Sequence, residues 1–230
     1  MAYTEDDLRQ FQQNEIQIDE SFKFECAMCG NCCRNRKDPI LVTGLDIFRI
    51  AQALGTTTEK VIAEKLEGYL GDTSHLPVFV LKERLDGSCS LLRQGRCTVH
   101  KNKPIVCAMH PLGRMYNVQE GSFHYFVSPG RCKGRADSER TWTLQEWLDE
   151  FGIRDLDKES LAWNDLLTAI SLITCKINKE NISEPMFGLM MNCMYLNYDT
   201  SKPYIEEVNR NKEMLKLAAP IIFKTKIEFS

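Results

Sequence analysis

Hydrophobic side chains recur at intervals of three and four residues in the stretch LVTGLDIFRIAQALG. This spacing predicts a helix with one buried face. Thr43 is suited to cap the first turn of this helix, and Gly55 is suited to end it. Thr56 and Glu59 then have the spacing of a capping box, which predicts a second helix that runs through about Tyr69.

Apolar and polar positions alternate in two other stretches, and alternation is the pattern of a half-buried strand. PVFVLKERL predicts one strand, and RMYNVQEGSFHYFV predicts a hairpin of two strands joined at Glu120 and Gly121. Helical spacing returns in TWTLQEWLDEFG, where Thr143 and Glu146 form another capping box. It continues over residues 158–176, about 184–198 and about 203–218.

Together these elements predict an α+β fold. We expect a small antiparallel sheet with helices around a cysteine-rich metal site, followed by a helical C-terminal part. The expected organisation is an N-terminal extension over residues 1–21, a cysteine-cluster domain over residues 22–150 and a helical region over residues 151–230.

The composition argues against several classes of function. The 230 residues carry a formal net charge of −3, which gives no global reason to expect binding to nucleic acid or to an anionic membrane. The N-terminus, MAYTEDDLRQFQQNE, lacks the basic and apolar regions of a secretory signal, and no apolar run approaches the length of a membrane span. We therefore expect a cytoplasmic protein, in a compartment that keeps thiols reduced. The sequence does not indicate the oligomeric state.

Ten cysteines in such a compartment favour metal ligation over structural disulfides. The run C-x2-C-x2-C, from Cys26 to Cys32, keeps three thiolates close together in the chain, and Gly30 allows the loop a positive φ. The same spacing opens bacterial ferredoxin motifs, where a further cysteine arrives from elsewhere with a proline nearby. Cys107, in KPIVCAMHP, suits that role.

The kind and number of metal sites stay open at this point. The ferredoxin spacing leads us to prefer a 4Fe–4S cluster, while zinc also accepts four thiolates, although paired C-x2-C knuckles are its usual arrangement. Adjacent side chains point different ways in most backbone conformations, so we expect that Cys32 and Cys33 do not both bind one ion. The pair then serves two sites, or one of its thiols is left over.

Basic residues accompany the cysteines. No Asp or Glu occurs from Ser88 through Gln119, whereas this segment contains Arg96 and Lys103, and Arg34 follows the first cluster. A tetrathiolate site with zinc or an oxidised four-iron cluster carries about two negative charges, which nearby cations offset. We take Arg34, Arg96 and Lys103 as candidate cofactor-binding residues, against the alternative that they are solvated surface charges.

The ordered set FECAMCGNCCR, ILVTGLDIFRIAQALG, GSCSLL and GRCTVHKNKPIVCAMHP, followed by one more cysteine, resembles the YkgJ-type cysteine-cluster family over about residues 22 to 150. That family is described as a zinc- or iron-chelating domain with the signature C-x2-C-x2-C-C. Carried over by position, the resemblance implies that the metal ligands are Cys26, Cys29, Cys32, Cys33, Cys89, Cys97, Cys107 and Cys132.

Some members of the family resemble flagellin lysine N-methylases. The resemblance therefore implies a second candidate function, an iron–sulfur-dependent transfer of a methyl group from S-adenosylmethionine to a lysine of a protein substrate. The basic surroundings of Cys89 to Cys107 would then hold the carboxylate of the methyl donor. A third candidate function is a thiol redox or metal-delivery module that uses Cys32 and Cys33.

Other histidines and cysteines receive lesser roles. His100 and His110 each lie three residues after a cysteine, and are alternative ligands or hydrogen-bond partners of the thiolates. Cys175 and Cys193 lie in the apolar helical contexts LITCKI and MNCMYL, so we expect both to pack in the core. His124, in a predicted strand, is expected to be structural or exposed.

Overall fold

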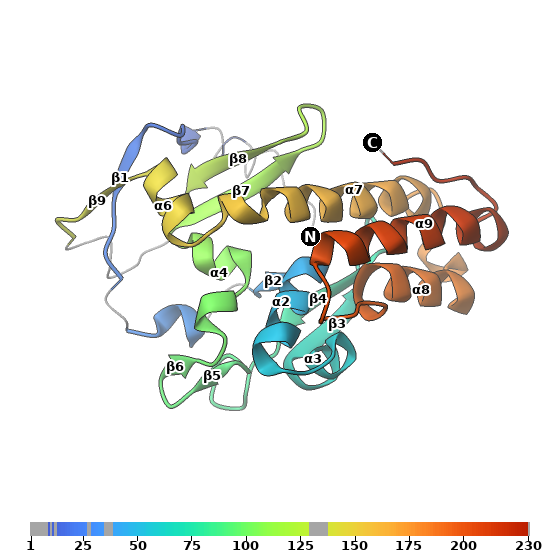
Figure 1. Ribbon diagram of the computed structural model, residues 1–230, viewed down its shortest axis with the longest axis horizontal. Helices are drawn as coiled ribbons and strands as arrows, with labels where there is room; N and C mark the ends of the chain where they lie inside the picture. The colour runs from blue at the N-terminus through green and yellow to red at the C-terminus, as the bar shows by residue number, and fades with distance from the viewer. Residues whose placement is uncertain are drawn as a thin grey trace. The chain divides into compact units, whose positions relative to one another are not determined.

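The computed structural model describes residues 9, 11, 13–26, 29–34, 39–128 and 138–229. These residues form helices and short antiparallel strands with a helical C-terminal part, which confirms the predicted α+β fold class (Figure 1). The chain divides into two compact units, which we describe separately: unit 1 consists of Lys37–Pro104 and Lys158–Ser230, and unit 2 of Ala2–Arg36 and Ile105–Asp157. Each unit combines segments that are distant in the sequence, so the division into residues 1–21, 22–150 and 151–230 stays a prediction.

Unit 1 contains a three-stranded antiparallel sheet. Its central strand, β4 (Pro77–Leu81), pairs with β2 (Leu41–Val42) on one side and with β3 (Leu66–Leu70) on the other. Between β2 and β3 the chain forms α2 (Gly44–Leu54) and α3 (Thr58–Lys65). The strand predicted from PVFVLKERL is therefore confirmed, with its end at Leu81.

The ends of α2 are fixed by the residues that the sequence singles out. Thr43 Oγ1 accepts a hydrogen bond from the Asp46 N–H (3.1 Å), and the Asp46 carboxylate accepts one from the Thr43 N–H (3.0 Å). This capping box satisfies backbone donors that the first helical turn leaves without partners. Gly55 ends the helix at φ 61°, in the left-handed region that favours glycine. The predicted first helix is confirmed at both ends.

The second predicted helix is correct at its start and wrong at its end. Thr57, one residue after the predicted Thr56, caps α3 by accepting a hydrogen bond from the Lys60 N–H. The helix stops at Lys65, and the residues up to Leu70 pair as β3 with β4 along their whole length. Pairing with a strand that lies later in the sequence overrides the local helical preference, which is worth only a few tenths of a kcal/mol per residue, or about that.

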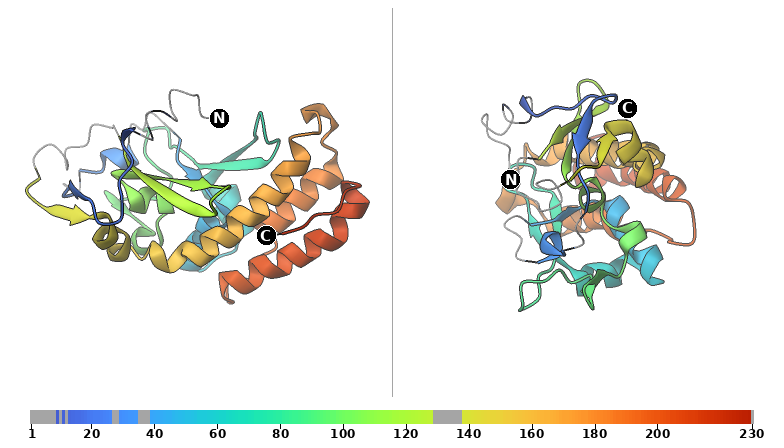
Figure 2. Two further views of the ribbon diagram at one scale, coloured as in Figure 1. Left: turned by 90° about the horizontal axis from the view of Figure 1, so that it is seen from above. Right: turned by 90° about the vertical axis from the view of Figure 1, so that its left-hand side faces the viewer.

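The C-terminal helices of unit 1 lie side by side in the views of Figures 1 and 2. They are α7 (Asp157–Thr174), α8 (Glu184–Met191), which continues into a π-helix, η5 (Asn192–Leu196), and α9 (Tyr204–Ile222). A short 3-10 helix, η4 (Lys179–Asn181), lies between α7 and α8. The three predicted helical stretches are thus confirmed, although the pattern reveals neither the change to a π-helix nor the extension of the last helix to Ile222.

The π-helix ties these helices to the sheet of unit 1. The Tyr195 hydroxyl donates a hydrogen bond to the Pro77 carbonyl (2.8 Å), at the start of β4. Thr58, at the start of α3, donates its hydroxyl to the Leu196 carbonyl (3.3 Å). Two of the elements that surround the sheet are therefore joined by side chains that leave no polar group unpaired at these points.

Unit 2 contains the predicted hairpin, formed by β7 (Leu112–Asn117) and β8 (Ser122–Val127). Gly121 has φ 65° in the connecting turn, which confirms the turn expected at Glu120 and Gly121. A second strand pair joins β1 (Ser21–Lys23) to β9 (Thr141–Thr143), close to the two ends of the described part of this unit. The helices of unit 2 are η1 (Asn31–Cys33), α4 (Ile105–Met109), α6 (Leu144–Glu150) and η3 (Arg154–Leu156).

The core of unit 2 forms around Trp147 of α6. Its ring lies edge-on to those of Phe24 (5.3 Å between centroids), Trp142 (5.2 Å) and Phe151 (4.7 Å). Such edge-to-face pairs add about 0.5–1.5 kcal/mol each beyond the burial of apolar area. Thr143 caps α6 through the predicted capping box with Glu146, so this element is also confirmed.

Among the described helices of both units, none combines the length and apolar character that crossing a lipid bilayer requires.

Candidate metal centre

The first cysteine cluster begins directly after a residue that is fixed in the core of unit 2. Phe24 is 2% exposed. Its N–H donates to the Arg140 carbonyl (3.0 Å), and its carbonyl accepts from the indole N–H of Trp142 (3.0 Å). The chain therefore enters the cluster from a defined position, two residues before Cys26.

A tight turn then carries the adjacent cysteines. Gly30 has φ 71°, in the left-handed region, and its carbonyl accepts the Cys33 N–H (2.9 Å) to form the 3-10 helix η1. The glycine in the cluster is thus used as the sequence predicts. In this turn the Sγ atoms of Cys32 and Cys33 lie 3.9 Å apart.

This distance overturns the expectation that the two adjacent thiols point different ways. In a tetrahedral site with metal–sulfur bonds of about 2.3 Å, two thiolates on the same ion lie about 3.8 Å apart. The observed Sγ–Sγ distance of 3.9 Å fits that geometry. The 3-10 turn is the physical reason, because it brings neighbouring side chains onto one side where an extended backbone would separate them.

The remaining thiols of the first cluster lie at the surface. Cys26, Cys29 and Cys32 are exposed, and Cys33 is half-buried. Among the described residues, no three His, Cys, Asp or Glu side chains converge as a metal site would require. The pair of Cys32 and Cys33 is therefore the part of the predicted ligand set that the structure brings to ligand spacing.

Cys107 belongs to the same unit as this cluster. It lies half-buried in α4, and the next two residues, Ala108 and Met109, are buried in the core of unit 2. The ring of His110, just after the helix, lies edge-on to Phe24 with 5.8 Å between centroids. The end of α4 and the chain that leads into Cys26 are therefore neighbours.

Two tryptophans that the sequence reasoning did not single out hold these two segments. Trp142 donates its indole N–H to the Phe24 carbonyl (3.0 Å), and Trp147 donates its own to the Met109 carbonyl (3.1 Å). The first bond fixes the chain before Cys26, and the second fixes the helix that carries Cys107. The aromatic residues in TWTLQEW, within the span of the family resemblance, are the signal that could have identified them.

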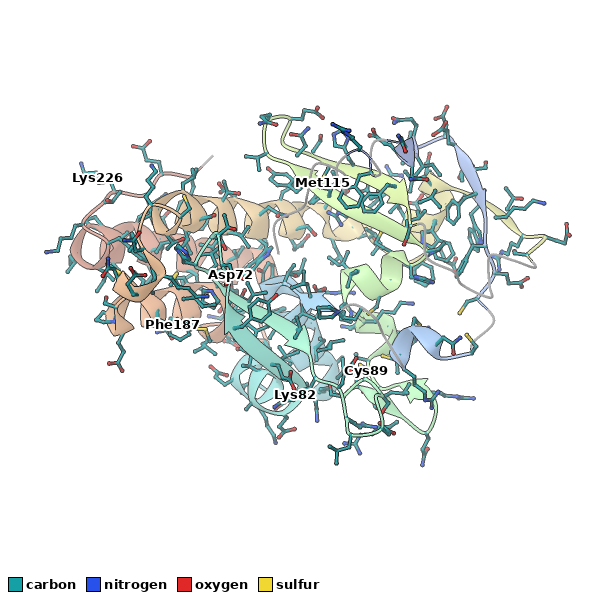
Figure 3. All side chains as sticks on the ribbon, turned by 180° about the vertical axis from the view of Figure 1, so that it is seen from behind. Asp72, Lys82, Cys89, Met115, Phe187 and Lys226 are labelled. Carbon is teal, nitrogen blue, oxygen red and sulfur yellow. The ribbon has the colours of Figure 1, made fainter. Side chains whose placement is uncertain are left out.

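Cys89 and Cys97 belong to unit 1, where they flank a small hairpin. Cys89 is buried, and its Sγ accepts the Leu91 N–H at 3.5 Å (Figure 3). Hydrogen bonds from backbone N–H groups to sulfur stabilise the thiolate form and are common around metal-bound cysteines. Cys97, half-buried, lies opposite Leu92 in the strand pair β5 (Leu92–Arg93) and β6 (Arg96–Cys97).

The eighth predicted ligand, Cys132, lies outside the described residues. Its role as a ligand stays a prediction from the family resemblance. Of the other seven, five belong to unit 2 and two to unit 1: Cys26, Cys29, Cys32, Cys33 and Cys107, and then Cys89 and Cys97.

The candidate cofactor-binding cations lie at different places. Arg34 is exposed, and its Nη1 lies 2.8 Å from where a Cβ on Gly30 would be, so its guanidinium folds back over the loop between Cys29 and Cys32. This position suits the offsetting of thiolate charge. Arg96 is exposed on β6, and Lys103 is half-buried after the 3-10 helix η2 (His100–Asn102).

The electrostatic surroundings of His100 favour its neutral form. Desolvation of the ring lowers the pKa of His100, and the positive charge of Lys103 lowers it further. A neutral imidazole has a nitrogen lone pair that can bind a metal or accept a hydrogen bond, so both roles predicted for His100 stay open.

The two isolated cysteines differ from each other. Cys193 is fully buried, and this burial raises the pKa of its thiol to about 12, so it packs as a small apolar side chain as predicted. The prediction is wrong for Cys175, which lies exposed just after the last residue of α7. The helix ends one residue too early to carry Cys175 on its buried face.

Comparison with known families identifies the cysteine region. A family model named for the pattern CxxCxxCC, with the description "Putative zinc- or iron-chelating domain", matches residues 25–133. The matched span contains all eight predicted ligands and both of the segments that Trp142 and Trp147 hold. No curated protein and no solved structure matches the chain.

Proposed function

Because the chain belongs, through residues 25–133, to the family of cysteine-cluster zinc- or iron-chelating domains, we propose that it binds a metal in which Cys32 and Cys33 ligate the same ion. The remaining ligands come from the other cysteines of the matched span. Metal binding by clustered cysteines is the property that the family assigns. The sharing of one ion by the adjacent pair is the finer part of the proposal.

The single observation that carries the finer part is the Sγ–Sγ distance of 3.9 Å between Cys32 and Cys33. Two thiolates share a metal in a mononuclear tetrahedral site, where four ligands surround one ion. In a four-iron cluster held by four cysteines each iron binds one of them, so an adjacent pair at this distance fits less well. The distance therefore supports a single zinc or iron ion.

The 4Fe–4S cluster preferred from the sequence stays the alternative, and the C-x2-C-x2-C spacing is the feature in its favour. In that arrangement only one thiol of the adjacent pair would bind the cluster. For methyl transfer from S-adenosylmethionine, no feature of the described residues adds support beyond the family resemblance.

The proposal is tested by removing the two thiols separately. We expect Cys32→Ser and Cys33→Ser each to lower the metal content of the purified protein, with an affinity loss greater than the about 10- to 100-fold that a lost outer contact costs. Cys175→Ser is the matched control, because Cys175 is exposed and lies outside the matched span. The measurement is metal per chain by elemental analysis after dialysis against a weak chelator.

The two arrangements give different results in this experiment. If one substitution abolishes metal binding and the other leaves it at the level of Cys175→Ser, the pair does not share an ion and the proposal is wrong. If neither substitution changes the metal content, the first cluster does not hold the metal at all.

A further inference from the structure

Unit 1 exposes an apolar side chain at the tip of an ordered turn. Leu85 is 111% exposed, more than in the reference extended peptide. The turn around it is nevertheless fixed: the Arg84 N–H donates to the Ser88 carbonyl (2.7 Å), and the Gly87 N–H donates to the Arg84 carbonyl (2.9 Å). Asp86 accepts from both the N–H and the hydroxyl of Ser88 (3.0 and 2.6 Å). Leu85 is thus held out in solvent by a structured loop.

The neighbouring hairpin holds two like charges against each other. Arg93 and Arg96 are directly opposite in the register of β5 and β6, and both are exposed. Gln94 and Gly95, between them, have φ 47° and 75°, so a residue other than glycine also takes the left-handed conformation. Like charges directly opposite in a strand pair are destabilising, and so is a positive φ at Gln94.

These cations have no local counter-charge. Within the described part of the chain, neither Arg93 nor Arg96 forms an ion pair, and the same holds for the exposed Lys101 of η2. The sequence itself has no acidic residue from Ser88 through Gln119. This part of unit 1 is therefore cationic in a protein whose net charge is −3.

The two turns are parts of one surface. Cys89 bridges to Glu83 on the side of the first turn, and its carbonyl accepts the Leu92 N–H (2.9 Å) at the start of the hairpin. Leu91 and Leu92, between the turns, are buried, so both turns project from the same packed base (Figure 3). We call the side chains of Leu85, Arg93 and Arg96 the two-turn surface.

We infer that the two-turn surface docks a partner protein, through an acidic segment that also carries an apolar side chain. The arginine pair supplies planar donors for carboxylates, and Leu85 supplies an apolar contact at the edge of the charged patch. A nucleic acid would use the arginines but not Leu85, and neither turn carries an aromatic side chain for stacking on bases. The combination of charge and exposed leucine therefore favours an acidic protein partner.

The inference is tested with the full-length protein as purified with its metal, using fluorescence anisotropy. The probe is a fluorescein-labelled twelve-residue peptide of glutamate and leucine, compared with an all-glutamate peptide and with a lysine–leucine peptide. We expect binding of the glutamate–leucine peptide that weakens as salt is added. Arg93→Glu should weaken it by about tenfold or more, and Leu85→Asp by several-fold.

The control for charge is Lys226→Glu, since Lys226 is exposed in the same unit and far from both turns in the sequence (Figure 3). We expect this variant to bind the peptide like the unchanged protein. A second measurement uses stability. Arg93→Glu turns a repulsive cross-strand pair into an attractive one, so it should raise the midpoint of urea unfolding while it weakens peptide binding.

Several outcomes would overturn the inference. They are no salt-dependent binding of the glutamate–leucine peptide, equal binding of the lysine–leucine peptide, equal loss in Lys226→Glu, or unchanged binding in Leu85→Asp. Stronger binding of a DNA duplex or of phosphatidylserine vesicles than of the peptide would assign the surface to another class of partner. Self-association that Arg93→Glu abolishes, seen by sedimentation, would make it an interface between copies of this chain.

Discussion

At the scale of single residues, the candidate metal centre depends on the 3-10 turn that follows Gly30. The positive φ of this glycine starts the turn, and the turn sets the Sγ atoms of Cys32 and Cys33 3.9 Å apart. Arg34 folds back over the same loop, so a cation lies where thiolate charge would accumulate. A general expectation about adjacent side chains fails here because the local backbone is not extended.

His124 gives a prediction about pH at the same scale. Its Nδ1 lies 2.7 Å from Glu15 and its Nε2 lies 2.6 Å from Glu120. Ionised carboxylates only accept hydrogen bonds, so both nitrogens donate and the ring is an imidazolium. The hydrogen bonds from Glu120 and then Glu15 raise the pKa of His124 above its usual 6.5.

The sign of the effect follows from this raised pKa. The stabilisation is complete below the pKa of His124 in the unfolded chain and is lost as pH rises through the higher pKa of the folded state. We expect His124→Phe to lower the free energy of unfolding at about pH 5.5 and to have a smaller effect at about pH 8.5. Urea unfolding at both pH values checks this, and an equal effect at both would contradict it.

Residue-level properties were predictable from the sequence only where they are local. The capping residue Thr43, the terminating Gly55 and the turn at Gly121 act through their own backbone, and all three are confirmed. The burial of Cys193 and the exposure of Cys175 are not local properties. Both lie in apolar sequence contexts, and the difference arises because α7 stops at Thr174.

At the scale of elements, two indole hydrogen bonds connect the segments that carry Cys26 and Cys107. Trp147 is 4% exposed, and its N–H donates to the carbonyl of the equally buried Met109 at the end of α4. Removing this donor leaves a buried carbonyl without its partner, which costs about 1–3 kcal/mol. The loss falls on the helix that carries Cys107.

Trp147→Phe should therefore weaken metal retention as well as stability, although Trp147 is not itself a ligand. Trp163→Phe is the matched control, since Trp163 is similarly buried but lies in unit 1, in α7. The measurement is the time course of metal loss to a chelator, beside thermal unfolding. If both variants unfold earlier but lose metal at the same rate, Trp147 does not position the centre.

Elements were predictable where their signals lie within the element itself. The helices capped by Thr43 and Thr143 and the hairpin of β7 and β8 follow from such signals. The strand β3 was missed because its partner β4 lies later in the chain, and only that pairing explains why α3 stops at Lys65. The π-helix was missed because apolar spacing does not distinguish it from an α-helix over five residues.

At the scale of the whole molecule, the cysteines of the family match are distributed over both compact units. The ordered motifs identify the family and the candidate ligands from sequence alone. They do not determine which thiols bind the same ion, since that depends on side-chain directions set by turns. The spacing C-x2-C-x2-C favours a four-iron cluster, while the geometry of the adjacent pair favours a single ion.

The most direct test of the account is X-ray absorption at the zinc or iron edge on protein purified without oxygen. A single ion shared by Cys32 and Cys33 predicts a first shell of sulfur atoms at about 2.3 Å and no second metal atom in the next shell. A neighbouring iron atom would contradict the account and identify a cluster. A bound metal without sulfur ligands would contradict the assignment of the cysteines themselves.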